Sequence, residues 1–182
     1  MKPKILITGP PRCGKSTMIT KLIEFYSKKN YKIYGFLTPE VKHINKRVGF
    51  DVQDIFTKIK FPLARIGNFN SEFKLGKYSV FIKEFEKYLD SALNMNENEI
   101  DLLIIDEIGK MELFSKKFQD FIKKFFQSEI PIIATIGEKI NHPVKDFILE
   151  IQNTTLILLN RENKNDVFLK IRNLLEINKK IS

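Results

Sequence analysis

The chain has 182 residues, 43% of them apolar, and a formal net charge of +9 at pH 7. This length and composition are typical of one globular domain, and no apolar run approaches the roughly 20 residues of a membrane helix. A single cysteine excludes an intramolecular disulfide and favours a reducing, cytoplasmic location, and a strand predicted almost at the first residue argues against a signal peptide.

The positive charge raises the question of nucleic-acid binding. The lysines are spread along the whole chain and fall mostly on the polar faces of predicted helices. The sequence contains neither an arginine-rich run nor an aromatic-studded RNA motif. Solvated helix faces explain the charge, so we do not expect nucleic acid as a partner. The sequence identifies no protein partner.

The first predicted element in chain order is a buried strand at Ile5 to Ile7. The segment Gly9-Pro10-Pro11-Arg12-Cys13-Gly14-Lys15-Ser16 follows it. Apolar residues at helical spacing come next, at Met18, Ile19, Leu22, Ile23, Phe25 and Tyr26. Glycines let such a loop turn its N–H groups onto an anion, and the helix adds the positive end of its dipole. The segment is a complete phosphate-binding loop, in which Lys15 reaches the β- and γ-phosphates and Ser16 ligates Mg²⁺.

Strand and helix patterns alternate along the chain, which predicts a parallel sheet flanked by helices. The run Lys32 to Leu37 is an extended segment. Residues Glu40 to Ile44 and Arg47 to Ile55 alternate around Asn45-Lys46, which predicts an inserted β-hairpin. The stretch Phe61 to Lys77 has few periodic signals and is predicted as loop, with a mobile surface segment at Gly67 to Ser71.

The second half of the chain continues the alternation. It comprises a helix from Ser79 to Leu93, a polar turn at Asn94 to Asn98, a strand at Leu102 to Ile105, a helix with the apolar stripe Phe118, Phe121, Ile122, Phe125 and Phe126, strands at Ile130 to Ile136 and Thr155 to Leu159, and a last helix from Asp166 to Ile177. Core packing explains the aromatic stripe. No linker interrupts the pattern, so residues 1–178 form one predicted domain and residues 179–182 a frayed tail.

The strand Leu102 to Ile105 is apolar at every position and runs into Asp106-Glu107. If this strand lies beside the first, it delivers Asp106 to the Mg²⁺ held by Ser16. Glu107 then orients and deprotonates a water that attacks the γ-phosphate. The adjacent glutamate favours hydrolysis, because a kinase mainly positions its acceptor and excludes water.

Three features of the sequence allow alternative interpretations. Gly109 permits a tight bend, after which Lys110 either points back at the phosphates or stays in solvent. Glu112 is either a further loop carboxylate or a residue at the start of a helix. The pair Asn160-Arg161 either flanks the base or caps the following helix. Cys13 is either a redox-sensitive thiol near a helix N-terminus or a tolerated small residue.

These arguments define the predicted site. The catalytic residues are Lys15, Glu107 and Lys110, and the Mg²⁺ ligands are Ser16 and Asp106. The nucleotide-binding residues are Gly9, Pro10, Pro11, Arg12, Cys13, Gly14, Lys15, Ser16, Thr17, Leu103, Ile104, Ile105, Asp106, Glu107, Ile108, Gly109, Lys110, Asn160 and Arg161.

The motifs also carry a family resemblance. The sequence is similar to the small nucleoside-triphosphatases first described from thermophilic archaea and bacteria, whose animal members are called cancer-related nucleoside-triphosphatases. The matching segments, in the family's order, are Gly9 to Thr17, Gly35 to Glu40, Lys46 to Asp51, Leu63 to Arg65, Gly76 to Tyr78, Asp106 to Leu113 and Asn160-Arg161. The resemblance implies a three-layer, RecA-like P-loop domain that slowly hydrolyses several nucleoside triphosphates, ATP, GTP, CTP and UTP among them, with Mg²⁺ and little base selectivity.

The sequence departs from the family in its phosphate loop, which is usually richer in glycine and has a small residue where Arg12 or Cys13 stands, so the shape of the loop needs a structural test. The sequence also does not decide which cation among Arg47, Arg65, Lys77, Lys110 and Arg161 reaches the γ-phosphate. Two other functions share the same chemistry. One is a phosphotransferase acting on a nucleoside or another small hydroxyl compound, although no arginine-dense lid is evident. The other is a nucleotide-gated switch with slow hydrolysis.

Overall fold

The computed structural model describes residues 2–93 and 96–177; residues 94–95 of the predicted turn and the predicted tail at 179–182 lie outside them. The strands are β1 (Lys4–Thr8), β2 (Ile33–Leu37), β3 (Glu40–His43), β4 (Lys46–Asp54), β5 (Lys60–Ile66), β6 (Phe73–Leu75), β7 (Tyr78–Val80), β8 (Leu102–Ile108), β9 (Ile132–Ile136) and β10 (Thr154–Leu158). The helices are α1 (Lys15–Ser27), α2 (Ile82–Leu93), α3 (Lys116–Gln127), α4 (Pro143–Glu150) and α5 (Lys164–Ile177), with 3-10 turns η1 (Glu97–Glu99) and η2 (Glu112–Phe114).

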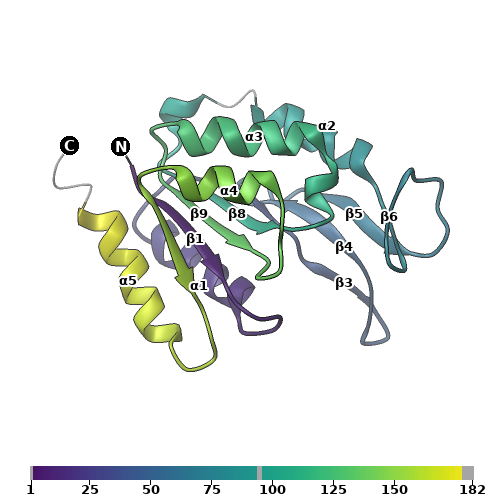
Figure 1. The fold of residues 1–182 in the computed structure, drawn as a ribbon, viewed down its shortest axis with the longest axis horizontal. Coiled ribbons are helices and arrows are strands. Elements are labelled where there is room, and N and C mark those ends of the chain that lie inside the picture. Colours follow the sequence, from purple (N-terminus) through teal and green to yellow (C-terminus); the bar gives the residue numbers. More distant parts are fainter. Residues whose placement is uncertain (1, 94–95, 178–182) are drawn as a thin grey trace.

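The strands form one sheet in the order β10-β1-β9-β8-β2-β4-β5-β7-β6, with β3 paired to β4 (Figure 1). The pairs from β10 across to β2 are parallel, and the pairs beyond β2 are antiparallel. The expectation that the acidic strand lies beside the first strand is wrong, because β9 separates β8 from β1. Sequence distance gives no information on which parallel strand is inserted between two others.

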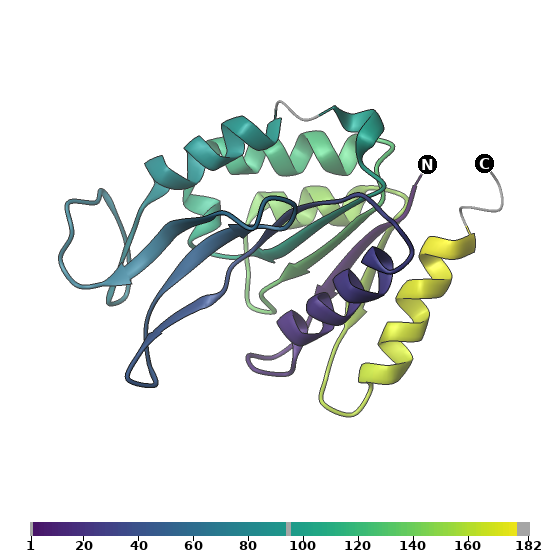
Figure 2. The ribbon, with the colours of Figure 1, turned by 180° about the vertical axis from the view of Figure 1, so that it is seen from behind.

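Helices cover both faces of the parallel part, which makes three layers (Figures 1 and 2). Alternate β-strand side chains divide between two cores: Leu103 and Ile105 pack with α2, α3 and α4, whereas Leu102 and Ile104 pack with α1 and α5. Strand β8 is therefore apolar on consecutive residues, as expected for a strand buried on both faces. The aromatic stripe of α3 lies in the first core, which confirms its packing role.

The region after β2 contains more strand than the sequence predicted. The hairpin β3–β4 is confirmed, but its turn is Ile44-Asn45, both with positive φ (46° and 59°), one residue earlier than expected. The prediction of loop over Phe61 to Lys77 is wrong for β5 and β6. Strand β5 pairs with β4 and β7, and a register shift occurs at Asp51, which pairs with Pro62. These pairings are distant in sequence, so the local pattern carried little sign of them.

Two helix predictions also change. The helix expected from Ser79 begins at Ile82, because Tyr78–Val80 form strand β7. Helix α4 was not predicted; it is eight residues long, begins at Pro143, and is capped by the His142 side chain, whose Nδ1 accepts from the Val144 N–H at 3.2 Å.

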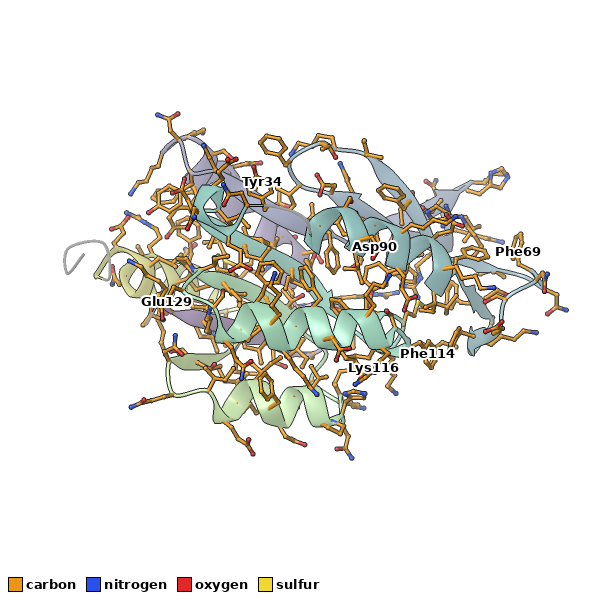
Figure 3. All side chains as sticks on the ribbon, turned by 90° about the horizontal axis from the view of Figure 1, so that it is seen from above. Tyr34, Phe69, Asp90, Phe114, Lys116 and Glu129 are labelled. Atoms are coloured by element: carbon orange, nitrogen blue, oxygen red, sulfur yellow. The ribbon has the colours of Figure 1, made fainter. Side chains whose placement is uncertain are left out.

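Helices α2 and α3 lie side by side along one face, with Asp90 on α2 and Lys116 on α3 (Figure 3). In the same view Phe69 and Glu129 lie at opposite ends of the molecule. Among the residues that the structure describes, no helix has the length and apolar character needed to cross a bilayer.

A buried lysine joins the first strand to the far end of α3. Lys4 is 1% exposed, and its Nζ donates hydrogen bonds to the carbonyl oxygens of Phe125 at 3.0 Å, Ser128 at 2.8 Å and Ile130 at 2.6 Å. Burial lowers the pKa of Lys4 to about 8. The side chain satisfies the Ser128 and Ile130 carbonyl oxygens beyond the end of α3 and adds a bond to the Phe125 carbonyl oxygen, which also accepts from the Ser128 N–H at 3.1 Å and hydroxyl at 2.8 Å.

Lys4→Met is expected to lower the free energy of unfolding by roughly 2 kcal/mol, because the buried Ile130 carbonyl oxygen and the part-buried Ser128 carbonyl oxygen lose the hydrogen bonds that Lys4 donates. For a domain of this size, that loss lowers the melting temperature by roughly 4–8 °C. Thermal denaturation followed by circular dichroism measures it. Lys170→Met, at an exposed position on α5, is the control and should change the melting temperature by less than about 2 °C. Equal melting temperatures for the two variants would contradict a structural role for Lys4.

Candidate active site

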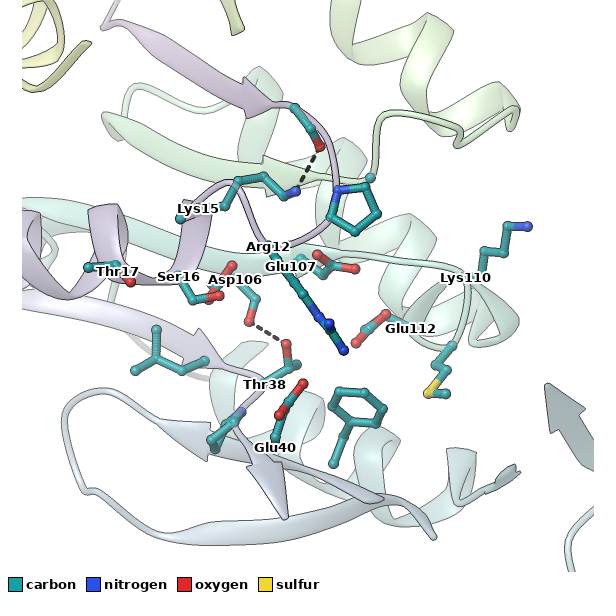
Figure 4. Close-up of a pocket in the computed structure, with 18 of the residues that line it drawn as sticks. Arg12, Lys15, Ser16, Thr17, Thr38, Glu40, Asp106, Glu107, Lys110 and Glu112 are labelled. Atoms are coloured by element: carbon teal, nitrogen blue, oxygen red, sulfur yellow. Dashed lines mark hydrogen bonds between the residues drawn. The ribbon is translucent and has the colours of Figure 1, made fainter. Parts of the chain in front are cut away.

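The phosphate loop connects the carboxyl end of β1 to α1 and has the backbone geometry that an anion cradle needs. Gly9 has φ 152°, and a Cβ there would lie 2.2 Å from the Leu159 carbonyl oxygen. Gly14 has φ 109°, and its carbonyl oxygen accepts the first helical hydrogen bond of α1, from Met18 N–H at 2.9 Å. Lys15 Nζ donates to the Gly9 carbonyl oxygen at 2.8 Å (Figure 4). Glycine is required at both bends, and the lysine ammonium is held at the mouth of the loop.

Arg12 does not disturb this loop. It takes a left-handed conformation with φ 61°, and the Cys13 N–H still donates to the Pro10 carbonyl oxygen at 3.3 Å. The guanidinium extends from the loop toward Glu112 and Glu40 (Figure 4). Cys13 is buried and packs against Gly9, in the core formed with α1 and α5. Its burial favours the interpretation as a small packing residue.

The acidic pair comes from the end of β8. Both Asp106 and Glu107 line the same cleft as Lys15 and Ser16, which confirms that the two motifs meet. The Thr135 hydroxyl on β9 donates to Asp106 Oδ1 at 2.5 Å, and the Thr38 hydroxyl donates to the Asp106 carbonyl oxygen at 2.8 Å (Figure 4). The inserted strand β9 therefore helps to hold the acidic residue that it separates from β1.

Burial raises the pKa of Asp106, and hydrogen bonds from Thr135 and Ser16 and the charge of Lys15 act against it. Burial also raises the pKa of Glu107, together with the charge of Asp106, again opposed by Lys15. Two adjacent carboxylates in one partly desolvated site thus share a single ammonium. Such a site favours the arrival of further positive charge.

A third carboxylate lies beside the pair. Glu112 is 4% exposed, lines the cleft, and approaches Gly109 so closely that a Cβ there would lie 2.5 Å from Glu112 Oε2 and 2.9 Å from Glu107 Oε1. Burial, with the charge of Glu107, raises the pKa of Glu112 to about 8. A β-carbon at residue 109 would therefore require the carboxylate groups of Glu112 and Glu107 to move.

The raised pKa of Glu112 makes stability depend on pH. From its ordinary value of 4.5 up to about 8, the unfolded chain releases this proton while the folded chain keeps it. The free energy of unfolding therefore falls as pH rises through this window. Between pH 5 and pH 8 the melting temperature should fall less for Glu112→Gln than for the unsubstituted chain. Glu99→Gln, at an exposed position, should match the unsubstituted chain. Parallel curves for all three would contradict the shift.

The structure separates the other predicted site residues into two groups. Leu103, Ile104, Ile105 and Ile108 are fully buried in the two cores, so they fix the position of the acidic pair and do not line the cleft. Lys110 lines the cleft, but its side chain points away from Glu107 and Glu112 (Figure 4). Its action on the phosphates stays a prediction.

The pair Asn160-Arg161 lies in the exposed turn before α5. Asn160 Oδ1 accepts hydrogen bonds from the N–H groups of Glu162 and Asn163, both at 2.9 Å. Asn163 Oδ1 in return accepts from Asn160 N–H at 2.9 Å. These bonds go to residues that precede α5, so Asn160 stabilises the turn before the helix and does not cap the helix itself. Neither Asn160 nor Arg161 lines the cleft.

The remaining cations divide in the same way. Arg65 is engaged elsewhere, with its NH2 2.5 Å from Asp51 Oδ1 and its NH1 donating to the Phe50 carbonyl oxygen at 2.7 Å. Arg47 lines the cleft, and Lys77 lines a smaller neighbouring pocket that also contains Arg12.

Sequence analysis missed Thr38 and Thr135. Both hold Asp106 and both follow apolar runs. Thr135 carried a signal, because it is the polar residue within the otherwise apolar strand Ile132–Ile136. A buried hydroxyl at the carboxyl end of a parallel strand is a candidate to hold a residue of the site.

A phosphate loop after a central strand, with an acid pair at the end of another parallel strand in the same cleft, defines a P-loop nucleotide-binding protein. A family model described as NTPase matches residues 4–172. The nucleoside-triphosphatase THEP1 of Thermotoga sp. (strain RQ2) is 35% identical over 182 residues, which cover 97% of each chain. That of Methanocaldococcus jannaschii is 34% identical over 170 residues, covering 93% of this chain and 95% of the relative.

Solved structures agree with the sequence relatives. The crystal structure of THEP1 from Aquifex aeolicus superposes with a TM-score of 0.80 at 34% identity, covering 95% of this chain and 99% of that one. The solution structure of a human cancer-related nucleoside triphosphatase gives 0.76 at 29% identity, covering 94% and 96%. The chain therefore belongs to the THEP1 family of nucleoside-triphosphatases, and the predicted family resemblance and three-layer α/β fold are confirmed.

Proposed function

We propose that the chain hydrolyses nucleoside triphosphates, ATP, GTP, CTP and UTP alike, to nucleoside diphosphate and inorganic phosphate with Mg²⁺. The observation that carries this proposal is that Lys15, Ser16, Asp106 and Glu107 line one cleft of about 1420 Å³. The phosphate loop with Lys15 thus faces the carboxylates of Asp106 and Glu107 across one cleft. The family's name supports the same reaction class.

The loop supplies most of the binding. Backbone N–H groups at the start of α1 and the positive end of its dipole attract the β- and γ-phosphates. Lys15, now bonded to the Gly9 carbonyl oxygen at 2.8 Å, is close enough to transfer its hydrogen bonds to a phosphate oxygen. Arg12 extends across the opening and offsets charge on the γ-phosphate side (Figure 4).

Glu107 is the proposed base. Its carboxylate accepts a proton from a water, and the water oxygen bonds to the γ-phosphorus. The bond from that phosphorus to the β–γ bridging oxygen breaks, and the electron pair leaves with the diphosphate. Lys15 and the loop N–H groups hold the charge that develops on the oxygens. Asp106, which is hydrogen-bonded to Thr135 and Ser16, is the proposed Mg²⁺ ligand and not the base.

The residues present fit a magnesium ion. Asp106 places a carboxyl group in a site where it is only 4% exposed, and the Ser16 hydroxyl is hydrogen-bonded to it. Hard oxygen donors of this kind suit Mg²⁺, which normally takes one or two protein oxygens and completes its shell with water and phosphate. Within the described residues no group of three or more His, Cys, Asp or Glu side chains is arranged around a metal position, which agrees with a site completed by the substrate. The ion, when bound, would neutralise charge between the β- and γ-phosphates.

Low base selectivity follows from what flanks the loop. The cleft beside α1 is lined by Thr17 and Thr20, whose hydroxyls do not distinguish one base from another. The Asn160 Oδ1 already accepts hydrogen bonds from two backbone N–H groups. Phosphate contacts do not involve the base, so the affinities for nucleotides with different bases should be similar.

We also propose a cytoplasmic location, because the single cysteine, Cys13, is buried and unpaired.

Initial rates of inorganic phosphate release from ATP, GTP, CTP and UTP test the proposed function. With Mg²⁺ we expect all four rates to lie within about tenfold of one another, because the loop supplies most of the transition-state contacts. Chelation of the metal with EDTA should abolish release from all four. Tight nucleotide binding without release would contradict the hydrolase, and release that survives chelation would contradict the metal.

A further inference from the structure

The cleft is larger than one nucleotide requires. Its volume is about 1420 Å³, whereas sites for a single small ligand span roughly 300–1,000 Å³. Residues of the phosphate loop, including Ser16 and Thr17, line one part of it. A second part lies on the other side of Arg12, whose side chain extends away from Ser16 toward Glu112 and Glu40 (Figure 4). We call this second part the outer compartment.

The outer compartment has an apolar wall built from separate elements. It consists of Phe50 on β4, Leu75 on β6 and Met111 before η2, all of which line the cleft and are partly exposed. The Phe50 ring lies under the Arg47 guanidinium, 5.2 Å from its centroid. An aromatic face beside a guanidinium fits a flat, apolar group with a negative charge nearby.

Cations gather at the rim of this compartment. A neighbouring pocket of about 390 Å³ is lined by Arg12, Lys42, Lys46, Arg47 and Lys77, with Glu40 as its acidic residue. Arg12, Glu40, Lys42 and Arg47 also line the main cleft, so the two hollows are adjacent. Arg47 is held in place by Glu40 at 2.8 Å and the Tyr78 hydroxyl at 3.0 Å. This surplus of positive charge fits a doubly charged phosphate.

The sequence showed no arginine-dense lid, because these cations come from the phosphate loop, the β3–β4 hairpin and the turn after β6. Folding brings them together around one pocket beside the phosphate loop. We infer that the outer compartment binds a nucleoside monophosphate, with its base against Phe50 and its phosphate between Arg12 and Arg47, and that the γ-phosphoryl group is transferred to it. This inference rests on the proposed binding of nucleoside triphosphate in the phosphate loop.

The transfer balances without a further reactant. A phosphate oxygen of the monophosphate bonds to the γ-phosphorus, the bond from that phosphorus to the β–γ bridging oxygen breaks, and the electron pair leaves with the diphosphate. Triphosphate and monophosphate become two diphosphates, with the same total charge and no proton released from fully ionised reactants. Water attack assisted by Glu107 is then the reaction that remains when the outer compartment is empty.

The test uses nucleoside triphosphate labelled on the γ-phosphate, with AMP, GMP, CMP or UMP, and separates labelled diphosphate from labelled inorganic phosphate. We expect labelled diphosphate from at least one monophosphate, absent when Lys15→Ala protein is purified and assayed identically. Phe50→Ala should raise the KM for the monophosphate about tenfold, a typical loss for one base–aromatic contact. Its phosphate release without acceptor should stay within twofold.

Controls separate the compartment from general damage. Phe56→Ala removes an exposed phenylalanine that stacks on Tyr34 outside the cleft, and it should leave the KM for the monophosphate unchanged. Lys46→Glu changes an exposed rim charge without disturbing the core, so it keeps the test valid if Phe50→Ala does not fold; it should raise that KM at least threefold.

Three outcomes overturn the inference. One is phosphate release without any labelled diphosphate, which leaves the proposed hydrolysis standing. Another is labelled diphosphate whose KM for the monophosphate is unaffected by Phe50→Ala and Lys46→Glu, which places the acceptor elsewhere. The last is absence of both phosphate release and nucleotide binding, in which case the proposed function fails together with the inference.

Discussion

Glu107→Gln is expected to slow phosphate release by roughly 10²- to 10³-fold, the usual contribution of a positioned base. The amide has the size of the carboxylate but does not accept a proton at neutral pH. Substrate affinity should stay within about threefold, because the loop supplies the phosphate contacts and Glu107 acts on the water. Single-turnover phosphate release and equilibrium binding of a labelled triphosphate measure the two effects separately.

The matched control is Glu138→Gln. Glu138 is exposed on the rim of the same cleft, so its substitution removes an equal charge from the neighbourhood of the substrate. Its turnover should stay within about twofold of the unsubstituted chain, as expected for a screened surface charge. Turnover of Glu107→Gln near that of the unsubstituted chain, with binding intact, would remove Glu107 from the water-activating role.

Lys15→Ala is expected to weaken triphosphate binding by roughly 10- to 100-fold, the loss for charge-assisted hydrogen bonds to an anion. Turnover should fall as well, because the ammonium also holds charge that develops during the reaction. The substitution removes the side chain that bonds to the Gly9 carbonyl oxygen at 2.8 Å, so the loop opening loses its cation. Isothermal titration with a slowly hydrolysed triphosphate analogue measures the affinity.

Lys21→Ala is the control for that experiment. Lys21 lies on the same helix, α1, but is exposed and does not line the cleft. It carries the same charge and should leave affinity within about twofold, because exposed charges are screened by salt. Undiminished binding by Lys15→Ala would overturn the assignment of the phosphate loop itself.

The identity of the phosphate loop and of the acidic pair could be predicted from the chain alone, because each depends on neighbouring residues. Gly9 and Gly14 are fixed by the local backbone conformations that they adopt, and Lys15 and Ser16 follow at the start of one helix. Asp106 and Glu107 follow four apolar residues within strand β8, and this apolar run indicates a strand that is buried on both faces. Family membership follows from these same segments in order.

The tertiary structure decided the rest, because the remaining contacts join residues far apart in sequence. Strand β9 lies between β1 and β8 and thereby brings Thr135 to Asp106. This is a property of the strand order, which the local periodicity of the sequence does not indicate. The same holds for β5, whose partners lie on β4 and β7. Arg12 appeared in sequence as a departure within the loop, yet only folding brings it toward Glu112 and Glu40, and joins it with Arg47 and Lys77 around one pocket. Local sequence determined the conformation of the loop, and long-range packing determined which side chains face it.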